Sequence, residues 1–310
     1  MDLDALVEGV LSGQPRAIAR AVSLVEDGAV ELPALSAALF PHTGSAWTVG
    51  LTGAPGVGKS SLANGLVGAG RGRGRRVSVL AVDPSSPFSG GALLGDRVRM
   101  QEHATDPEVF IRSMAARGHL GGMALAAPEA VRILDAAGAE LLVVETVGVG
   151  QAELDVATAT DTTIVVVQPA WGDAVQVAKA GILEIADVFV VNKADLEGAH
   201  QTVRDLEAML RLGGRPAWMP PVLEVSSHAG DGMDSLWDTI GLHRAHLEEH
   251  DAVEPARVLR LRREVENLVA GSVRPQVERL LDEDPGLLED LRARAVDPYG
   301  AASRLRARLP

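Results

Sequence analysis

The chain has 310 residues, of which 46% are hydrophobic and none is cysteine, and its formal net charge is −13. This composition predicts one globular domain with extensions in a reducing cytoplasm, and it excludes disulfides and thiolate metal sites. The negative charge argues against nucleic acid and anionic membranes as partners. The acidic start MDLDALVEGVL resembles neither a signal nor a transit peptide. No apolar run reaches the length of about 18 residues that predicts a membrane span.

The predicted elements begin with helices and then alternate. Residues 2–39 carry apolar side chains at helical spacing and predict an N-terminal helical extension. Beyond them, helical segments separate apolar runs that lack two-residue alternation. This pattern predicts an α/β fold with a mostly parallel central sheet flanked by helices on both faces. The predicted strands are residues 47–53, 76–83, 109–114, 140–145, 162–168, 187–195 and 221–227.

The pattern changes near Pro255, where apolar residues take a heptad-like spacing that Pro275 interrupts. Two interpretations fit this stretch: a terminal helix packed on its own domain, or a protruding arm that mediates self-association. The predicted organisation is an N-terminal helical extension at residues 1–40, an α/β domain at 41–250 and a C-terminal helical arm at 251–310.

The stretch GAPGVGKS, residues 53–60, fits the phosphate-binding pattern of a P-loop, and it lies between a predicted strand and a predicted helix. Its glycines let backbone N–H groups close around phosphates. Lys59 would bridge the terminal phosphates, and the Ser60 hydroxyl would ligate Mg²⁺. The residues predicted to bind nucleotide here are Gly53, Ala54, Pro55, Gly56, Val57, Gly58, Lys59, Ser60 and Ser61.

The stretch NKAD, residues 192–195, ends another predicted strand and favours guanine. In GTPases the aspartate accepts hydrogen bonds from the guanine N1–H and exocyclic amine, a donor pair that adenine lacks, and the lysine stem packs along the base. The stretch VSSHAG, residues 225–230, resembles the further GTPase loop whose backbone N–H contacts the guanine oxygen. GTP and GDP are the predicted ligands, and the predicted base-side residues are Asn192, Lys193, Asp195, Ser226, Ser227 and His228.

Lysine usage is informative because only three of the 29 basic residues are lysine. Lys59 and Lys193 fall within nucleotide motifs, which makes the third, Lys179, a functional candidate; the alternative is a surface lysine on a helix. The stretch RGRGRR, residues 71–76, predicts a solvated basic turn, with an acidic partner as the alternative.

Strand-end acids supply candidate metal ligands. Glu145 ends the apolar run LLVVE, Asp83 ends another strand, and Asp96 lies in a Gly-bounded loop. Mg²⁺ prefers an octahedral shell of oxygens, so these three acids and Ser60 could supply the protein part of that shell, directly or through water. Taken alone, Asp83 could be a helix cap and Asp96 a loop acid.

The motifs together with the strings LAVDPSSPFSGGALLGDRVRM, FIRSMAARGHLGG and VVETVGVGQAE resemble the MeaB/ArgK/MMAA GTPases. These are G-protein chaperones of adenosylcobalamin-dependent acyl-CoA mutases, notably methylmalonyl-CoA mutase. The resemblance implies that residues 41–250 are a P-loop GTPase domain and that the protein is a homodimer built with its terminal helical extensions. It implies a second switch from Glu145 to Gly148, whose N–H would meet the γ-phosphate. Asp83 and Asp96 would serve Mg²⁺ and the first switch, and Lys179 would lie in a third switch that reports nucleotide state to the mutase.

The sequence departs from the family pattern at partner-facing positions. Ala174 and Val175 stand where some relatives have Glu-Leu, and Ala152 where they often have Ser. The predicted catalytic residues are Lys59, Glu145, Gly148 and Lys179, acting with Mg²⁺ in phosphoryl transfer to water. No side-chain general base is evident, so turnover is expected to be slow and stimulated by the partner.

Two other functions are weaker alternatives. A metallochaperone GTPase of the nickel-enzyme-maturation type would need a metal site, and the helically spaced trio His243, His246 and His250 could form one, although a solvated helix end accounts for it better. A scaffold or small-molecule kinase is disfavoured, because no acceptor-binding constellation is found and NKAD argues against ATP.

Overall fold

The centre of the structure is a parallel β-sheet. The computed structural model describes residues 2–84, 101–103, 105–116, 123–146, 159–169, 184–212 and 217–309. These residues form a seven-stranded sheet in the order β3-β2-β4-β1-β5-β6-β7, and all of its strand pairs are parallel. The predicted fold class is confirmed. The strands are β1 Trp47–Thr52, β2 Val77–Pro84, β3 Val109–Ala116, β4 Leu141–Thr146, β5 Thr162–Val167, β6 Val188–Asn192 and β7 Val222–Val225.

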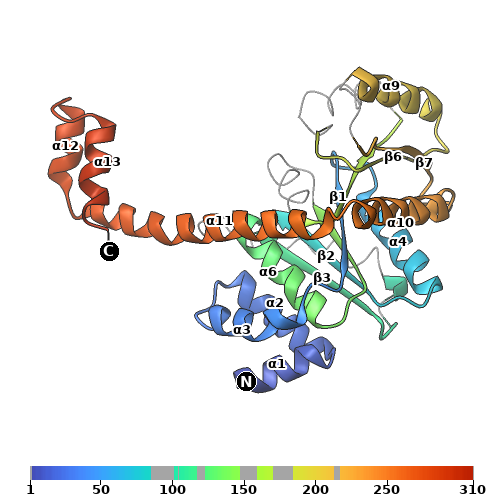
Figure 1. The fold of residues 1–310 in the computed structure, drawn as a ribbon, viewed down its shortest axis with the longest axis horizontal. Helices are drawn as coiled ribbons and strands as arrows, with labels where there is room; N and C mark the ends of the chain where they lie inside the picture. Colours follow the sequence, from blue (N-terminus) through green and yellow to red (C-terminus); the bar gives the residue numbers. More distant parts are fainter. Residues whose placement is uncertain are drawn as a thin grey trace.

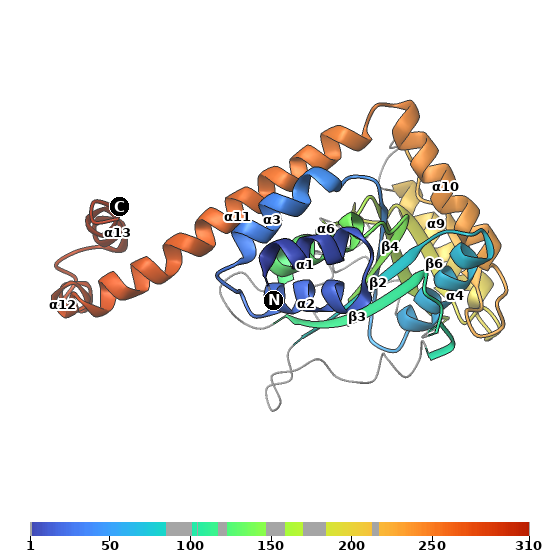
Figure 2. The same cartoon turned by 90° about the horizontal axis from the view of Figure 1, so that it is seen from below.

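Helices cover the two faces of this sheet (Figures 1 and 2). One core contains α1 Leu3–Leu11, α2 Pro15–Glu26, α3 Leu32–Leu39 and α6 Met123–Ala136, and the other contains α4 Lys59–Gly72 and α10 Met233–Glu249. Consecutive residues of β4 alternate between these cores: Leu142 belongs to the first and Val143 to the second. Burial on both faces explains why the strands read as uninterrupted apolar runs. The remaining helix of this part, α9 Ala199–Leu212, packs beside β6 and β7, and the short 3₁₀ helices are η1 Phe40–His42 and η2 Gln101–His103.

A long C-terminal helix, α11 Val253–Asp282, extends away from the sheet and carries α12 Pro285–Arg292 and α13 Pro298–Arg306 near its far end (Figure 1). Its 30 residues correspond to about 45 Å of helix. The helix continues through Pro275. At the far end, Leu287, Ala301 and Leu305 form a small core of their own. Within the described ranges, the structure holds no helix with the length and apolarity that crossing a bilayer requires.

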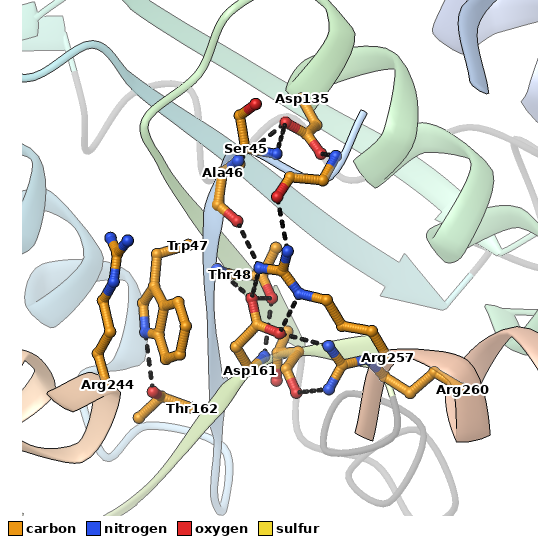
Figure 3. Close-up of polar contacts among 12 residues, drawn as sticks. Ser45, Ala46, Trp47, Thr48, Asp135, Asp161, Thr162, Arg244, Arg257 and Arg260 are labelled. Atoms are coloured by element: carbon orange, nitrogen blue, oxygen red, sulfur yellow. Dashed lines mark hydrogen bonds and ion pairs between the residues drawn. The ribbon is translucent and has the colours of Figure 1, made fainter. Parts of the chain in front are cut away.

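The base of α11 is fixed to the sheet by a buried ion cluster around Asp161, which directly precedes β5 (Figure 3). The Asp161 carboxylate, whose side chain is only 3% exposed, accepts hydrogen bonds from the Thr48 backbone N–H at 3.1 Å and the Thr48 hydroxyl at 2.9 Å. Arg257 binds it at 3.0 Å, and Arg260 forms a second ion pair with it. The first turns of α11 are therefore joined to β1 and to the start of β5.

Each arginine of this cluster also caps backbone carbonyls. Arg257 donates to the carbonyl of Gly44 at 2.6 Å and to that of Ala46 at 3.1 Å, and Arg260 donates to that of Thr160 at 3.0 Å. A guanidinium has five N–H donors in a rigid fork, which suits one residue to bind a carboxylate and carbonyls together. The helix base is therefore held by charge and by backbone contacts at once.

Candidate functional site

The loop between β1 and α4, residues 53–58, has the tight backbone that the P-loop motif predicts. Gly53 and Gly58 have φ angles of 138° and 95°, a region that side chains disfavour. A Cβ atom at Gly53 would lie 2.1 Å from the Val166 carbonyl oxygen, and one at Gly58 would lie 2.3 Å from Nδ2 of Asn192. Glycine is therefore required at both positions, for conformation and for space.

Lys59 and Ser60 lie at the first turn of α4. The buried Lys59 ammonium donates to the carbonyl oxygens of Gly53 at 2.7 Å and Ala54 at 3.0 Å, so it lies within the loop it follows. The Ser60 hydroxyl donates to Oε1 of Glu145 at 2.6 Å. Glu145 is buried in β4, which pairs directly with β1. Two of the four predicted metal ligands are thus in contact, although they lie 85 residues apart.

For the other predicted metal and switch residues, the structure describes no side chain. Asp83 lies in β2 beside β4, but only its backbone is described. Asp96, Gly148 and Lys179 lie outside the described residues. Their roles therefore stay predictions.

Asn192, at the end of β6, joins the P-loop to the loop after β7. Its fully buried side-chain amide donates to the Val57 carbonyl at 2.8 Å and accepts a hydrogen bond from the Ser227 backbone N–H at 3.1 Å. One side chain thereby satisfies polar groups of two loops that are far apart in sequence. The three predicted nucleotide-binding stretches, around residues 53–61, 192–195 and 226–228, lie at one edge of the sheet.

Lys193 and Asp195 follow Asn192 in the loop after β6, at the same edge of the sheet. Lys193 has a φ angle of 59°, uncommon for a residue with a side chain, and its ammonium donates to the Gly56 carbonyl at 2.8 Å. Asp195 accepts a hydrogen bond from the Ser226 hydroxyl at 2.6 Å, and this bond lowers the pKa of the carboxyl group. Asp195 is therefore an ionised acceptor, as pairing with the two N–H donors of guanine requires.

The sequence interpretation missed Gln168. Its Oε1 accepts a hydrogen bond from the Lys193 ammonium at 2.7 Å. The available signal was its place one residue after a strand of a parallel sheet, where binding residues gather at the carboxyl ends.

His243, His246 and His250 do not converge on a position where they could bind a metal ion. His243 lies against Trp218 with its side chain 3% exposed, and its Nδ1 is 2.9 Å from the Thr162 hydroxyl, so the expectation of a solvated helix end is wrong for this residue. His250 donates to the backbone carbonyl of His246. Among the described residues, no group of three or more His, Cys, Asp or Glu side chains is placed to hold a metal ion.

The arginines of residues 71–76 are paired within the chain. Arg71, Arg73, Arg75 and Arg76 form ion pairs with Asp106, Asp234, Glu140 and Glu108, respectively. These acids lie in α10 and in the loops before β3 and β4, so the ion pairs join the end of α4 and the loop after it to these segments. Its positive charge is largely compensated before any partner arrives.

The P-loop at the end of β1, the Ser60–Glu145 contact and the NKAD loop that Asn192 joins to the P-loop are the features of a P-loop GTPase. Comparison with known protein families agrees with this class. The family model described as "Methylmalonyl Co-A mutase-associated GTPase MeaB" matches residues 18–280 of this chain. The chain belongs to this MeaB family, as its sequence motifs predict.

Relatives extend the match over nearly the whole chain. A Pyrococcus horikoshii protein named as a GTPase is 45% identical over 304 residues, covering 97% of this chain and 96% of its own. GTPase ArgK of Escherichia coli is 38% identical and covers 74% and 72%, respectively. The mouse protein "Methylmalonic aciduria type A homolog, mitochondrial" is 36% identical and covers 77% and 62%. The crystal structure of an LAO/AO transport system kinase superposes with a TM-score of 0.73 at 26% identity, covering 98% and 96%.

Proposed function

We propose that this GTPase is a nucleotide-dependent chaperone of an adenosylcobalamin-dependent acyl-CoA mutase, and that its partner is methylmalonyl-CoA mutase. The observation that carries the proposal is the family match, which spans the nucleotide site and most of α11. The family description names that mutase, and the mouse relative is named after methylmalonic aciduria. GTP hydrolysis would drive the conformational cycle that gates cobalamin loading and protection, in the cytoplasm.

Within this proposal, Lys59 offsets charge that develops on the terminal phosphates, and the P-loop backbone holds them. Ser60 and Glu145 would hold Mg²⁺, and they fit that ion because they offer a hydroxyl and a buried carboxylate as hard oxygen donors. Bound there, the ion would polarise the phosphate oxygens. We assign Asp83 and Asp96 to the same set. Gly148 and Lys179 are assigned to the second and third switches.

On the base side, the ionised Asp195 pairs with the guanine N1–H and exocyclic amine, and the Lys193 stem lies along the base. Asn192 does not contact the base in this proposal. It acts indirectly, because its hydrogen bonds fix the P-loop and the Ser227 loop relative to each other. These assignments predict strong discrimination against ATP, because adenine leaves the Asp195 carboxylate without its donor pair.

We also propose that α11 is a dimerisation arm occupied by a second copy of this chain. Its base is anchored by Arg257 and Arg260, and both between and beyond these arginines apolar side chains remain exposed, several of them in a heptad-like row. Exposed members of this surface are Val258, Leu259, Leu261, Val265, Leu268 and Val269. Leu268→Lys is expected to shift the protein from dimer to monomer in sedimentation equilibrium. Asn267→Lys adds the same charge to the neighbouring exposed position and should leave the dimer intact.

The chaperone role is tested with purified protein and methylmalonyl-CoA mutase. We expect a complex on size-exclusion chromatography whose affinity differs between GDP and a non-hydrolysable GTP analogue, and a higher GTP hydrolysis rate when the mutase is added. Equal hydrolysis rates with and without the mutase would contradict the chaperone role. Equal hydrolysis of ATP and GTP would contradict the base assignment instead.

A further inference from the structure

The Lys193 ammonium is held from two sides by parts of the chain that are remote in sequence. It donates to the Gly56 carbonyl of the P-loop at 2.8 Å and to the Gln168 side chain at 2.7 Å. A lysine has a flexible four-carbon stem with three donors at its tip, so fixing the tip at two points fixes the path of the stem.

The strand topology explains why Gln168 can reach this lysine. β5 and β6 are parallel neighbours, with Val167 paired to Val191. Gln168 follows Val167 directly, and Lys193 follows Val191 by two residues, so both leave the same edge of the sheet. The left-handed backbone of Lys193, with φ at 59°, turns the chain at this point. The contact is thus built by the sheet register and by a locally disfavoured conformation.

We propose that Gln168 is a positioning residue for nucleotide binding, acting through Lys193. It holds the ammonium beside the P-loop. The Lys193 stem is thereby kept where it packs against the face of the guanine base. This inference rests on the proposed base contact of Lys193. Gln168 also directly precedes residues 169–181, the stretch assigned to the third switch, so the same hydrogen bond lies at the start of that stretch.

The geometry makes a specific kinetic prediction. Gln168 acts on the base side of the site, and GTP and GDP share the same base. Its loss should therefore lower the affinities for GTP and GDP by the same factor. A hydrogen bond to a charged group is worth enough for a loss of about tenfold. Gln168→Ala should therefore raise KM for GTP and the dissociation rate of fluorescent GDP about tenfold, with kcat unchanged at saturation. Gln168→Glu keeps an acceptor oxygen opposite the ammonium and should restore GDP retention.

A double-variant cycle separates action through Lys193 from a general structural effect. Lys193→Met keeps an apolar stem but removes the ammonium, so it should lose GDP affinity about as much as Gln168→Ala. Adding Gln168→Ala to Lys193→Met should cause no further loss. Gln201→Ala, which removes an exposed glutamine bonded to Asp205 on α9, is the matched control and should behave as the unaltered protein.

Each contrary result has a defined meaning. Fully additive losses in the cycle, or a Gln168→Ala variant that retains GDP normally, would overturn the positioning role of Gln168. Normal GDP retention by Lys193→Ala would overturn the base contact of Lys193 and the inference with it. None of these measurements uses a mutase, so failure of the chaperone proposal remains distinguishable. Thermal unfolding of every variant verifies that the compared proteins are folded.

Discussion

The ion cluster at the base of α11 allows a stability prediction to be worked through from its contacts. Asp161→Ala removes one carboxylate that serves both Arg257 and Arg260 and also accepts two hydrogen bonds from Thr48 (Figure 3). Removing one partner of a buried ion pair costs about 3–5 kcal/mol. The two arginine side chains are 20% and 21% exposed and regain some hydration, so we expect the lower end, about 3 kcal/mol.

The assay is urea unfolding followed by circular dichroism at neutral pH. The control is Glu266→Ala, which removes the exposed partner of Arg262 on the same helix and should cost at most about 0.5 kcal/mol. If Asp161→Ala lowers the free energy of unfolding no more than Glu266→Ala does, the cluster does not anchor the arm.

The same carboxylate gives the prediction a pH signature. Burial opposes ionisation of Asp161, but hydrogen bonding from Arg257 and the charges of Arg260 and Arg257 outweigh it, so its pKa is lowered. A lowered pKa contributes stability that is present above the unfolded-state pKa of about 3.9 and is lost as the pH falls through the folded-state value. The difference in unfolding free energy between the unaltered protein and Asp161→Ala should therefore shrink below about pH 4.

Three further predictions concern the nucleotide site and α10. Glu145→Ala should weaken Mg²⁺-dependent GTP hydrolysis while leaving GDP affinity largely intact; hydrolysis at the normal rate would remove Glu145 from the metal set. Gly58→Ala should abolish GDP binding in equilibrium titration, because its Cβ would lie 2.3 Å from Nδ2 of Asn192. Burial lowers the pKa of His243 to about 4. Its contribution to the free energy of unfolding therefore rises with pH between about 4 and 6.5. His243→Gln should flatten unfolding free energy over that window, and an unchanged slope would contradict this.

The fold was largely predictable because its signals are local. Strands buried on both faces appear as continuous apolar runs, and the P-loop glycines leave a fixed spacing between a strand and a helix. Strand order has no such local signature. The sheet places β4 between β2 and β1, and it is this order that brings Glu145 beside Leu51 and within reach of Ser60. The Mg²⁺ ligand set could be proposed from the sequence, but the contact between these residues could not.

Longer-range contacts were missed for the same reason. Arg257 and Arg260 lie three residues apart on one face of α11, but nothing nearby in sequence indicates that Asp161 receives both. His243 did have a usable signal. It continues the apolar stripe of Leu236 and Ile240 at helical spacing, which predicts a buried position for it. Its type, a titratable residue near a helix end, favoured the wrong interpretation over its place in the pattern.

The contrast between lysine and arginine in this chain connects composition with mechanism. Both lysines that the structure describes, Lys59 and Lys193, place their ammonium groups on carbonyl oxygens of the P-loop. The arginines at the base of α11 and in residues 71–76 each bind a carboxylate, and several of them also donate to backbone carbonyls outside the P-loop. A compact ammonium fits among converging loop carbonyls, whereas the planar guanidinium fork matches a carboxylate. In the described part of the chain, lysine therefore binds the P-loop backbone, and these arginines join the elements around it.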